Sequence, residues 1–152
     1  MSTPAAGPGT VGGRRYGAGM STPTPAGAAG PIARLAAVAL DCPDPDALAA
    51  FYAALLGTEV DPDESEDDWV QLRPVGGAVP LAFQRVDDHR PPQWPGAEHP
   101  QQVHLDLAVP DLDAGEAAVV VHGARKHEFQ PGETFRVFLD PAGHPFCLVL
   151  DS

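Results

Sequence analysis

Pro43-Asp44-Pro45-Asp46-Ala47 and, 67 residues further on, Pro110-Asp111-Leu112-Asp113-Ala114 decide the fold. Each stretch follows an alternating apolar run and precedes apolar residues at helical spacing. The folded part of the chain therefore reads as two copies of one unit.

The first copy begins with a predicted strand over residues 35–40, which leads into a helix. Asp44 suits the N-cap of this helix, Pro45 suits its first position, and Gly57 supplies its end. The apolar face of the helix consists of Leu48, Phe51, Tyr52, Leu55 and Leu56. Three short strands are predicted to follow, over residues 58–60, 69–73 and 80–86.

The second copy repeats this order. A strand over residues 102–109 leads into a helix over residues 112–122, which Gly123 ends. Three strands follow, over residues 125–129, 135–139 and 145–150. Each β-α-β-β-β unit leaves one face of its sheet bare, so pairing two units completes the core and encloses a cavity.

The sequence thus predicts an α+β protein of two βαβββ modules paired into an open, incomplete barrel. Module one covers residues 33–87, a linker rich in Pro and His covers 88–100, and module two covers 101–151, all within one domain over 31–152. Residues 1–30 are almost entirely Gly, Ala, Pro, Ser and Thr. They cannot bury enough apolar surface, so we expect a disordered tail.

Charge excludes some classes of partner. The 152 residues include 9 Lys and Arg against 21 Asp and Glu, a net charge of −12. This charge repels phosphate backbones and anionic lipids, so we expect neither nucleic acid nor membrane as a partner. No apolar stretch is long enough to span a bilayer, and the apolar segment that an export signal needs does not follow Arg14-Arg15. We therefore expect a cytoplasmic protein. Cys42 and Cys147 are then expected to be free thiols.

Two motifs carry a resemblance. His104-Leu105-Asp106 opens module two, and Asp140-Pro141-Ala142-Gly143-His144-Pro145-Phe146-Cys147, which also reads as a turn between strands, closes it. With the duplicated unit, these motifs resemble the glyoxalase/bleomycin-resistance/extradiol-dioxygenase superfamily, also called vicinal oxygen chelate (VOC). Within it, they resemble the glyoxalase-like domain proteins of actinobacteria. The superfamily includes metal-dependent enzymes and metal-free proteins that sequester drugs. The resemblance therefore implies a cavity for a small molecule but no single activity.

Alternation along each strand sorts side chains between a helix-covered face and a cavity face. On this basis the cavity is predicted to contain His104, Asp106, Cys147, Trp69, Gln71, Gln84, Arg136 and Phe138. We expect His104, held by Asp106, to act as a general base, and the other six residues to bind the substrate.

Each of these roles has a structural alternative. His104 could instead hydrogen-bond the linker or Asp106 and hold module two in register. Asp106 could form a buried pair with Arg136, and Cys147 could be a small buried hydrophobic residue. Trp94 could cover the cavity mouth, or it could pin the linker to the barrel.

The resemblance also assigns four metal-ligand positions, on the first and last strands of both modules. They fall on Ala37, Ala82 (or Gln84), His104 and Cys147. Alanine offers no lone pair, and a catalytic site needs about three protein ligands. Asp106 lies two residues from His104, roughly 6.5–7 Å along a strand, which is too far for easy sharing of one ion. We therefore name no cofactor, and a divalent metal is the less favoured alternative.

These features leave three functions open. The preferred one is a glyoxalase-like lyase, isomerase or related enzyme that acts on a small oxygenated or aromatic metabolite without the full four-ligand metal site. The second is a metal-free protein that sequesters such a ligand, as drug-resistance members of the superfamily do. The third is a packing module that dimerises. Whether two chains form a homodimer stays open.

Overall fold

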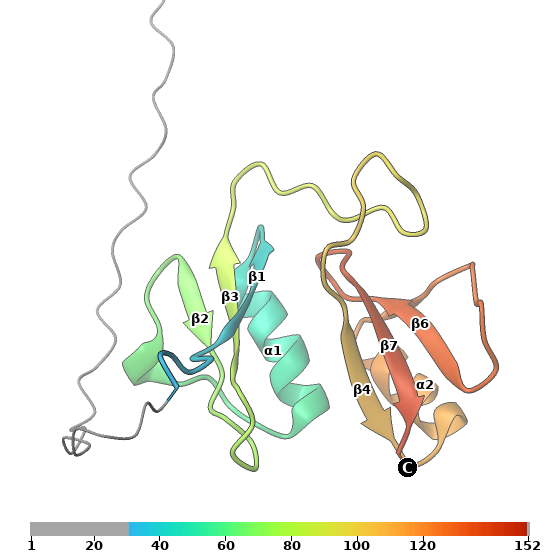
Figure 1. The fold of residues 1–152 in the computed structure, drawn as a ribbon, viewed down its shortest axis with the longest axis horizontal. Coiled ribbons are helices and arrows are strands. Elements are labelled where there is room, and N and C mark those ends of the chain that lie inside the picture. The colour runs from blue at the N-terminus through green and yellow to red at the C-terminus, as the bar shows by residue number, and fades with distance from the viewer. Residues whose placement is uncertain (1–30, 152) are drawn as a thin grey trace, which may run out of the picture. The chain divides into compact units, whose positions relative to one another are not determined.

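A computed structural model describes residues 31–151, so the tail predicted over residues 1–30 lies outside the described part of the chain. From Ala33 onward the chain forms one compact unit. The described residues of this unit form two separate sheets and two α-helices, an α+β arrangement without a closed barrel (Figure 1).

Module one forms a three-stranded sheet with one α-helix. Its elements are β1 (Val38–Cys42), α1 (Pro45–Leu56), the 3₁₀ turn η1 (Pro62–Glu64), β2 (Trp69–Gln71) and β3 (Leu81–Arg85). β3 is the central strand, parallel to β1 and antiparallel to β2. The strand predicted over residues 58–60 is reduced to a single bridge between Val60 and Leu72.

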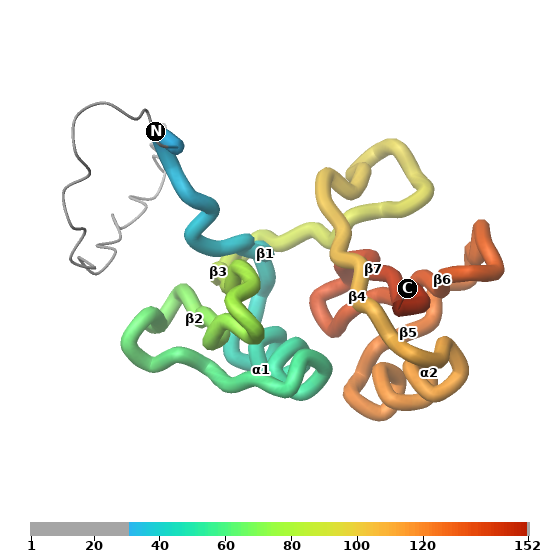
Figure 2. Tube along the Cα trace, turned by 60° about the horizontal axis from the view of Figure 1, so that its bottom comes forward, coloured from blue at the N-terminus to red at the C-terminus, as the bar shows by residue number. Residues whose placement is uncertain are grey.

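Module two repeats this topology with a fourth strand. Its elements are β4 (Leu105–Val109), α2 (Leu112–Val121), β5 (Arg125–Lys126), β6 (Phe135–Leu139) and β7 (Pro145–Leu150), with strand order β4-β7-β6-β5. β4 is parallel to β7, as β1 is to β3. Figure 2 traces the long loop that connects β3 to β4. The shared topology confirms the predicted duplication.

Both helices begin where their sequences predict. Asp44 Oδ1 accepts the backbone N–H of Ala47 at 3.0 Å, and Asp111 Oδ1 accepts that of Ala114 at 2.7 Å. A cap of this kind typically contributes ~1 kcal/mol. After α1, Gly57 has a φ of 64°, a left-handed conformation in which a side chain would be strained.

Aromatic side chains from both modules fill the core. Tyr52 of α1 stacks on Phe83 of β3, with 5.5 Å between the ring centroids. Phe51 of α1 packs edge-on against Phe146 of β7 at 6.0 Å. Tyr52, Phe83 and Phe146 are all fully buried. The helix of module one therefore helps to bury the sheet of module two, and the two modules share one core.

A buried carboxylate joins the modules at Asp140, in the turn between β6 and β7. Asp140 is 1% exposed. Its Oδ2 accepts the hydroxyl of Tyr52 at 3.0 Å and lies 2.8 Å from Nδ1 of His144. Its Oδ1 accepts the backbone N–H groups of Ala142 and His144, both at 2.9 Å. The motif therefore forms the predicted turn and also ties that turn to α1.

We expect the contribution of His144 to stability to fall as the pH rises. Burial disfavours the charged imidazole, but the hydrogen bond and negative charge of Asp140 outweigh burial and raise the pKa of His144 above its usual value. The protonated ring thus stabilises the fold. Its contribution is fully present below the unfolded-state pKa of about 6.5 and is lost as the pH rises through the higher folded-state pKa.

Urea unfolding of the native protein and of His144→Gln, from about pH 5.5 to about pH 9, measures this effect. The difference in the free energy of unfolding between the two proteins should shrink across this range. His122→Gln, which changes an exposed histidine at the end of α2, controls for the general effect of removing an imidazole. A difference for His144→Gln that stays constant with pH would contradict the prediction.

Candidate functional site

Three side chains that can carry chemistry lie together on one face of the module-two sheet. Asp106 of β4 lies directly opposite Cys147 of β7, and residues opposite one another point to the same face. Nε2 of His104, the residue before β4, is 3.4 Å from Oδ1 of Asp106. One potential ligand atom from each residue lies within 4.8 Å of the other two. The structure thus brings together three of the predicted site residues.

Solvent reaches this His104–Asp106–Cys147 cluster. The side chains of His104 and Asp106 are 45% and 56% exposed, and Cys147 is half-buried. Burial raises the pKa of the Cys147 thiol to about 11, with further contributions from the charge and the hydrogen bond of Asp106. The thiol is therefore protonated at neutral pH, unlike the thiolate of a nucleophilic cysteine.

The expected separation of His104 and Asp106 is wrong. The distance of roughly 6.5–7 Å describes backbone positions on a regular strand. His104 lies before the first residue of β4, and its imidazole comes within 3.4 Å of the carboxylate of Asp106. Both side chains are therefore close enough to act on one atom. The distance between the two residues along the strand did not indicate this.

A pocket of about 200 Å³ lies beside the cluster. Its lining consists of Trp94, Gln101, His104, Pro131, Phe135, Val137, Pro145 and Cys147. Trp94 comes from the linker and packs against His127 and Phe129, with ring centroids 5.3 and 5.5 Å away. Trp94 therefore pins the linker to module two and also forms a wall of the pocket.

Sequence reasoning missed Gln101, Phe135 and Val137. Oε1 of Gln101 is buried and has no hydrogen-bond partner among the described residues. Val137 lies directly opposite Cys147 across the sheet, and Phe135 is two residues earlier on the same strand. The register between β6 and β7 would have revealed both, but it depends on the length of the turn between these strands.

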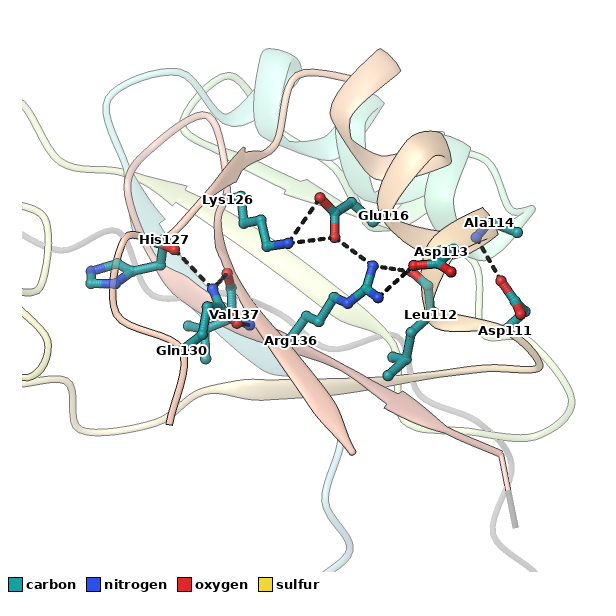
Figure 3. Close-up of polar contacts among 10 residues, drawn as sticks. All are labelled: Asp111, Leu112, Asp113, Ala114, Glu116, Lys126, His127, Gln130, Arg136 and Val137. Carbon is teal, nitrogen blue, oxygen red and sulfur yellow. Dashed lines mark hydrogen bonds and ion pairs between the residues drawn. The ribbon is translucent and has the colours of Figure 1, made fainter. Parts of the chain in front are cut away.

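Two predicted cavity residues, Arg136 and Phe138, lie on the helix-covered face instead. The guanidinium of Arg136 donates to Glu116 at 2.6 Å and to Asp113 at 2.5 Å, both on α2 (Figure 3). Phe138 is fully buried and stacks on Phe146 at 5.7 Å. The predicted pair between Asp106 and Arg136 is also wrong, because Arg136 reaches the acids of α2.

A one-residue change within the repeat explains this error. The offset of 67 places Phe138 at the position of Gln71. In the structure Gln71 lies opposite Ala82, whereas Val137 lies opposite Cys147 at the corresponding place in module two. Val137, at an offset of 66, is thus the true equivalent of Gln71. A shift of one residue turns every side chain of a strand to the other face.

The module-one residues lie on the predicted face of their own sheet. Trp69 is opposite Gln84, and Gln71 is opposite Ala82. Their face is the one turned away from Phe83, which stacks on α1. None of them lines the 200 Å³ pocket. The structure therefore does not bring Trp69, Gln71 or Gln84 to the pocket beside His104.

The profile of the Glyoxalase-like domain family matches residues 37–149, which span both modules and the site. This chain belongs to the glyoxalase-like domain family. The resemblance carried by the motifs is thus confirmed for the family. No curated protein is significantly similar to the chain in sequence.

Solved structures share the fold of this glyoxalase-like chain. A glyoxalase/bleomycin resistance protein/dioxygenase family enzyme from Burkholderia phytofirmans PsJN matches with a TM-score of 0.61 and 16% identity, over 78% of this chain and 98% of that one. A glyoxalase/dioxygenase from Nostoc punctiforme matches with a TM-score of 0.58 and 19% identity, over 86% and 99%. The trypanothione-dependent glyoxalase I of Leishmania major matches with a TM-score of 0.53 and 18% identity, over 78% and 86%.

The four-ligand metal site that the superfamily implies does not fit this glyoxalase-like chain. Ala37 and Ala82 have no ligand atoms. Of the other two positions, His104 offers an imidazole and Cys147 a thiol, and Asp106 adds a carboxylate beside them; all three residues are in module two. These residues make a different donor set, because they include a thiol and need nothing from module one.

Proposed function

We propose that this glyoxalase-like protein binds and acts on a small oxygenated or aromatic metabolite, without the four-ligand metal site of the superfamily. The observation that supports this proposal most is the pocket beside the cluster. Trp94 and Phe135 offer aromatic surface in this pocket, and His104 and Cys147 offer polar atoms. A concave apolar site with a few convergent polar groups is typical of small-molecule binding.

The pocket favours a small ligand without negative charge. Its volume of about 200 Å³ is below the roughly 300–1,000 Å³ of pockets for drug-sized ligands. No Lys or Arg is among its lining residues, and Asp106 lies nearby. The buried Oε1 of Gln101, which lacks a partner among the described residues, favours a hydroxyl or amine on the ligand as a hydrogen-bond donor.

His104 and Asp106 are the proposed catalytic residues. The imidazole lines the pocket and has a carboxylate 3.4 Å from its Nε2. A carboxylate beside an imidazole orients the ring, which suits a general base that removes a proton from the ligand. Trp69, Gln71 and Gln84 share the corresponding face of module one but lie outside the pocket lining, so we assign them no part in this pocket.

A panel of metabolites tests this function. A ligand of the pocket should raise the melting temperature by several degrees, and product analysis then separates turnover from binding. We expect His104→Gln to lower turnover by about 10²–10⁴-fold while ligand-induced stabilisation persists. His99→Gln, a histidine outside the pocket lining, is the control and should turn over normally. A panel of phenols, ketones and aldehydes that leaves the melting temperature unchanged would contradict the proposal.

A metal-free protein that sequesters its ligand is the second candidate. The aromatic walls at Trp94 and Phe135 favour it, because stacking on such walls needs no reactive group. In that case the ligand stabilises the protein, no product forms, and His104→Gln has no effect on the ligand's fate.

Location, assembly and source are also proposed from the sequence. Among the described residues, no helix is long and apolar enough to cross a membrane. We propose a cytoplasmic protein of actinobacterial type, without nucleic-acid or membrane partners because its net charge is −12. Size measurement in solution would show whether it forms a homodimer.

A further inference from the structure

We propose that a groove between the last turn of α1 and one face of α2 binds a small amphiphilic amine. The hydrocarbon part of the amine lies in the groove, and its ammonium lies at the rim. The groove shares no lining residue with the 200 Å³ pocket beside His104. The proposal therefore stands without the proposed function.

The groove has the size and the apolar lining of a small-molecule site. Its volume is about 330 Å³, within the roughly 300–1,000 Å³ that is usual for such sites. Except for Asp106 and His122, all of its lining residues are apolar. The larger apolar side chains come from both modules: Leu55, Leu56, Leu107, Val109, Val119 and Leu148.

Several of these side chains are left incompletely covered. Leu55, Leu107 and Val109 pack against the core but are only partly buried. Ala54 of α1 and Ala118 of α2 also line the groove, and both are exposed. Their methyl groups are too small to fill the space between the helices. Hydrocarbon placed there removes apolar surface from water, which favours binding.

The electrostatics of the groove favour a positive charge. Neither helix has a basic residue in its last turn. No Lys or Arg lines the groove, whereas the acidic Asp106 does. The C-terminal end of a helix carries a partial negative charge, and the net charge of the chain is −12. The groove therefore attracts a cation and repels an anion.

The end of α1 also offers acceptors for hydrogen bonds. Its last three residues, Ala54, Leu55 and Leu56, all line the groove. Among residues 31–151, no backbone N–H donates to their carbonyl oxygens, because the N–H groups that follow the helix donate to Ala53. An ammonium has three N–H donors, and its charge strengthens hydrogen bonds to carbonyl oxygens. A primary amine therefore matches this rim better than an alcohol or a carboxylic acid.

The volume limits the hydrocarbon part to a short chain. A volume of about 330 Å³ corresponds to roughly eleven water molecules at about 30 Å³ each. Octylamine, with about nine non-hydrogen atoms, is close to this limit. An amine of this type is protonated at neutral pH, as the side chain of lysine is.

Calorimetric titration of the full chain with octylamine, octanol and octanoate tests the proposal, because these probes share a chain and differ in the headgroup. We expect one octylamine per chain with a Kd below about 1 mM. Octanol should bind at least about 10-fold more weakly, and octanoate should not bind. Hexylamine should bind about 10-fold more weakly than octylamine, because each buried methylene contributes about fourfold.

Two matched substitutions on α2 locate the site. Ala118→Leu puts a larger side chain into the groove and should weaken octylamine binding at least about 10-fold. Ala117→Leu makes the same change one residue earlier, where the side chain lies beside Glu116 and Arg136 outside the groove, and should leave the affinity unchanged. Ala54→Leu repeats the test from α1. Circular dichroism checks that each variant is folded.

Three results would overturn the proposal: no binding of octylamine up to about 1 mM, octanoate bound as tightly as octylamine, or equal effects of Ala118→Leu and Ala117→Leu. A second copy of the chain is the competing occupant. A native dimer that Ala118→Leu converts to a monomer would therefore also overturn it. Failure of the proposed function looks different, because Phe135→Ala changes the pocket beside His104 and should leave octylamine binding unchanged.

Discussion

We expect Asp140→Ala to lower the free energy of unfolding by about 3–5 kcal/mol. Asp140 is 1% exposed and accepts hydrogen bonds from Tyr52, Ala142 and His144. Without the carboxylate, the buried hydroxyl of Tyr52 and the partly buried donors of Ala142 and His144 lose their partner, at a cost of about 1–3 kcal/mol for each donor that cannot reach water. Since a domain is stable by about 5–15 kcal/mol in total, this loss is large.

Denaturant unfolding measures this loss. Tyr52→Phe removes a single hydrogen bond across the modules, so it should cost about 1 kcal/mol. Asp113→Ala, at a side chain that is 87% exposed, is the matched control and should cost at most about 1 kcal/mol. If Asp140→Ala does not fold, Asp140→Asn serves as a milder change. A loss no larger than that of Asp113→Ala would show that the junction does not hold the modules together.

Phe138→Ala should be about as damaging, with a loss of about 3–5 kcal/mol. Phe138 is fully buried and stacks on Phe146, which in turn contacts α1. Truncation leaves a cavity in the core that both modules share, and cavity formation adds to the lost transfer free energy of the ring. The same substitution at a cavity wall would cost much less, so this variant tests the corrected face of β6.

Phe135→Ala is the matched control, because Phe135 is on the same strand, lines the 200 Å³ pocket and is only partly buried. We expect it to cost less than about 2 kcal/mol and to weaken ligand binding instead. Guanidinium unfolding of the two variants gives the comparison. Equal losses, or a larger one for Phe135→Ala, would place the faces of β6 the other way round.

Local signals predicted the helices well and the strands less evenly. The carboxylates of Asp44 and Asp111 cap α1 and α2 as expected, since a cap depends on residues three positions away. The predicted strand over residues 58–60 survives only as the bridge from Val60 to Leu72. Strand formation depends on pairing with distant residues, and sequence alone does not show how many of them pair.

The site was predictable to the extent that it lies on strands paired in parallel. His104, Asp106 and Cys147 come together because β4 and β7 run side by side, and alternation along each strand predicts which face each side chain takes. The face of Arg136 has no such signal. The rest of its strand, β6, is entirely apolar, so the sequence allows Arg136 to lie on either face. Its ion pairs with Asp113 and Glu116 of α2 place Arg136 on the helix-covered face.

By itself, the sequence determined the duplicated β-α-β-β-β plan and the starts of both helices, because local patterns of apolar and capping residues recur in the two copies. The resemblance to the superfamily placed Ala37 and Ala82 at two of its metal-ligand positions. The tertiary structure alone decided the face of β6, the pocket wall supplied by Trp94, and the short distance between His104 and Asp106. These depend on turn lengths, on a linker that folds back, and on where side-chain ends converge. Comparing the two copies by sequence does not reveal that a turn is one residue shorter in one of them. That difference nevertheless turns every side chain of the following strand to the other face.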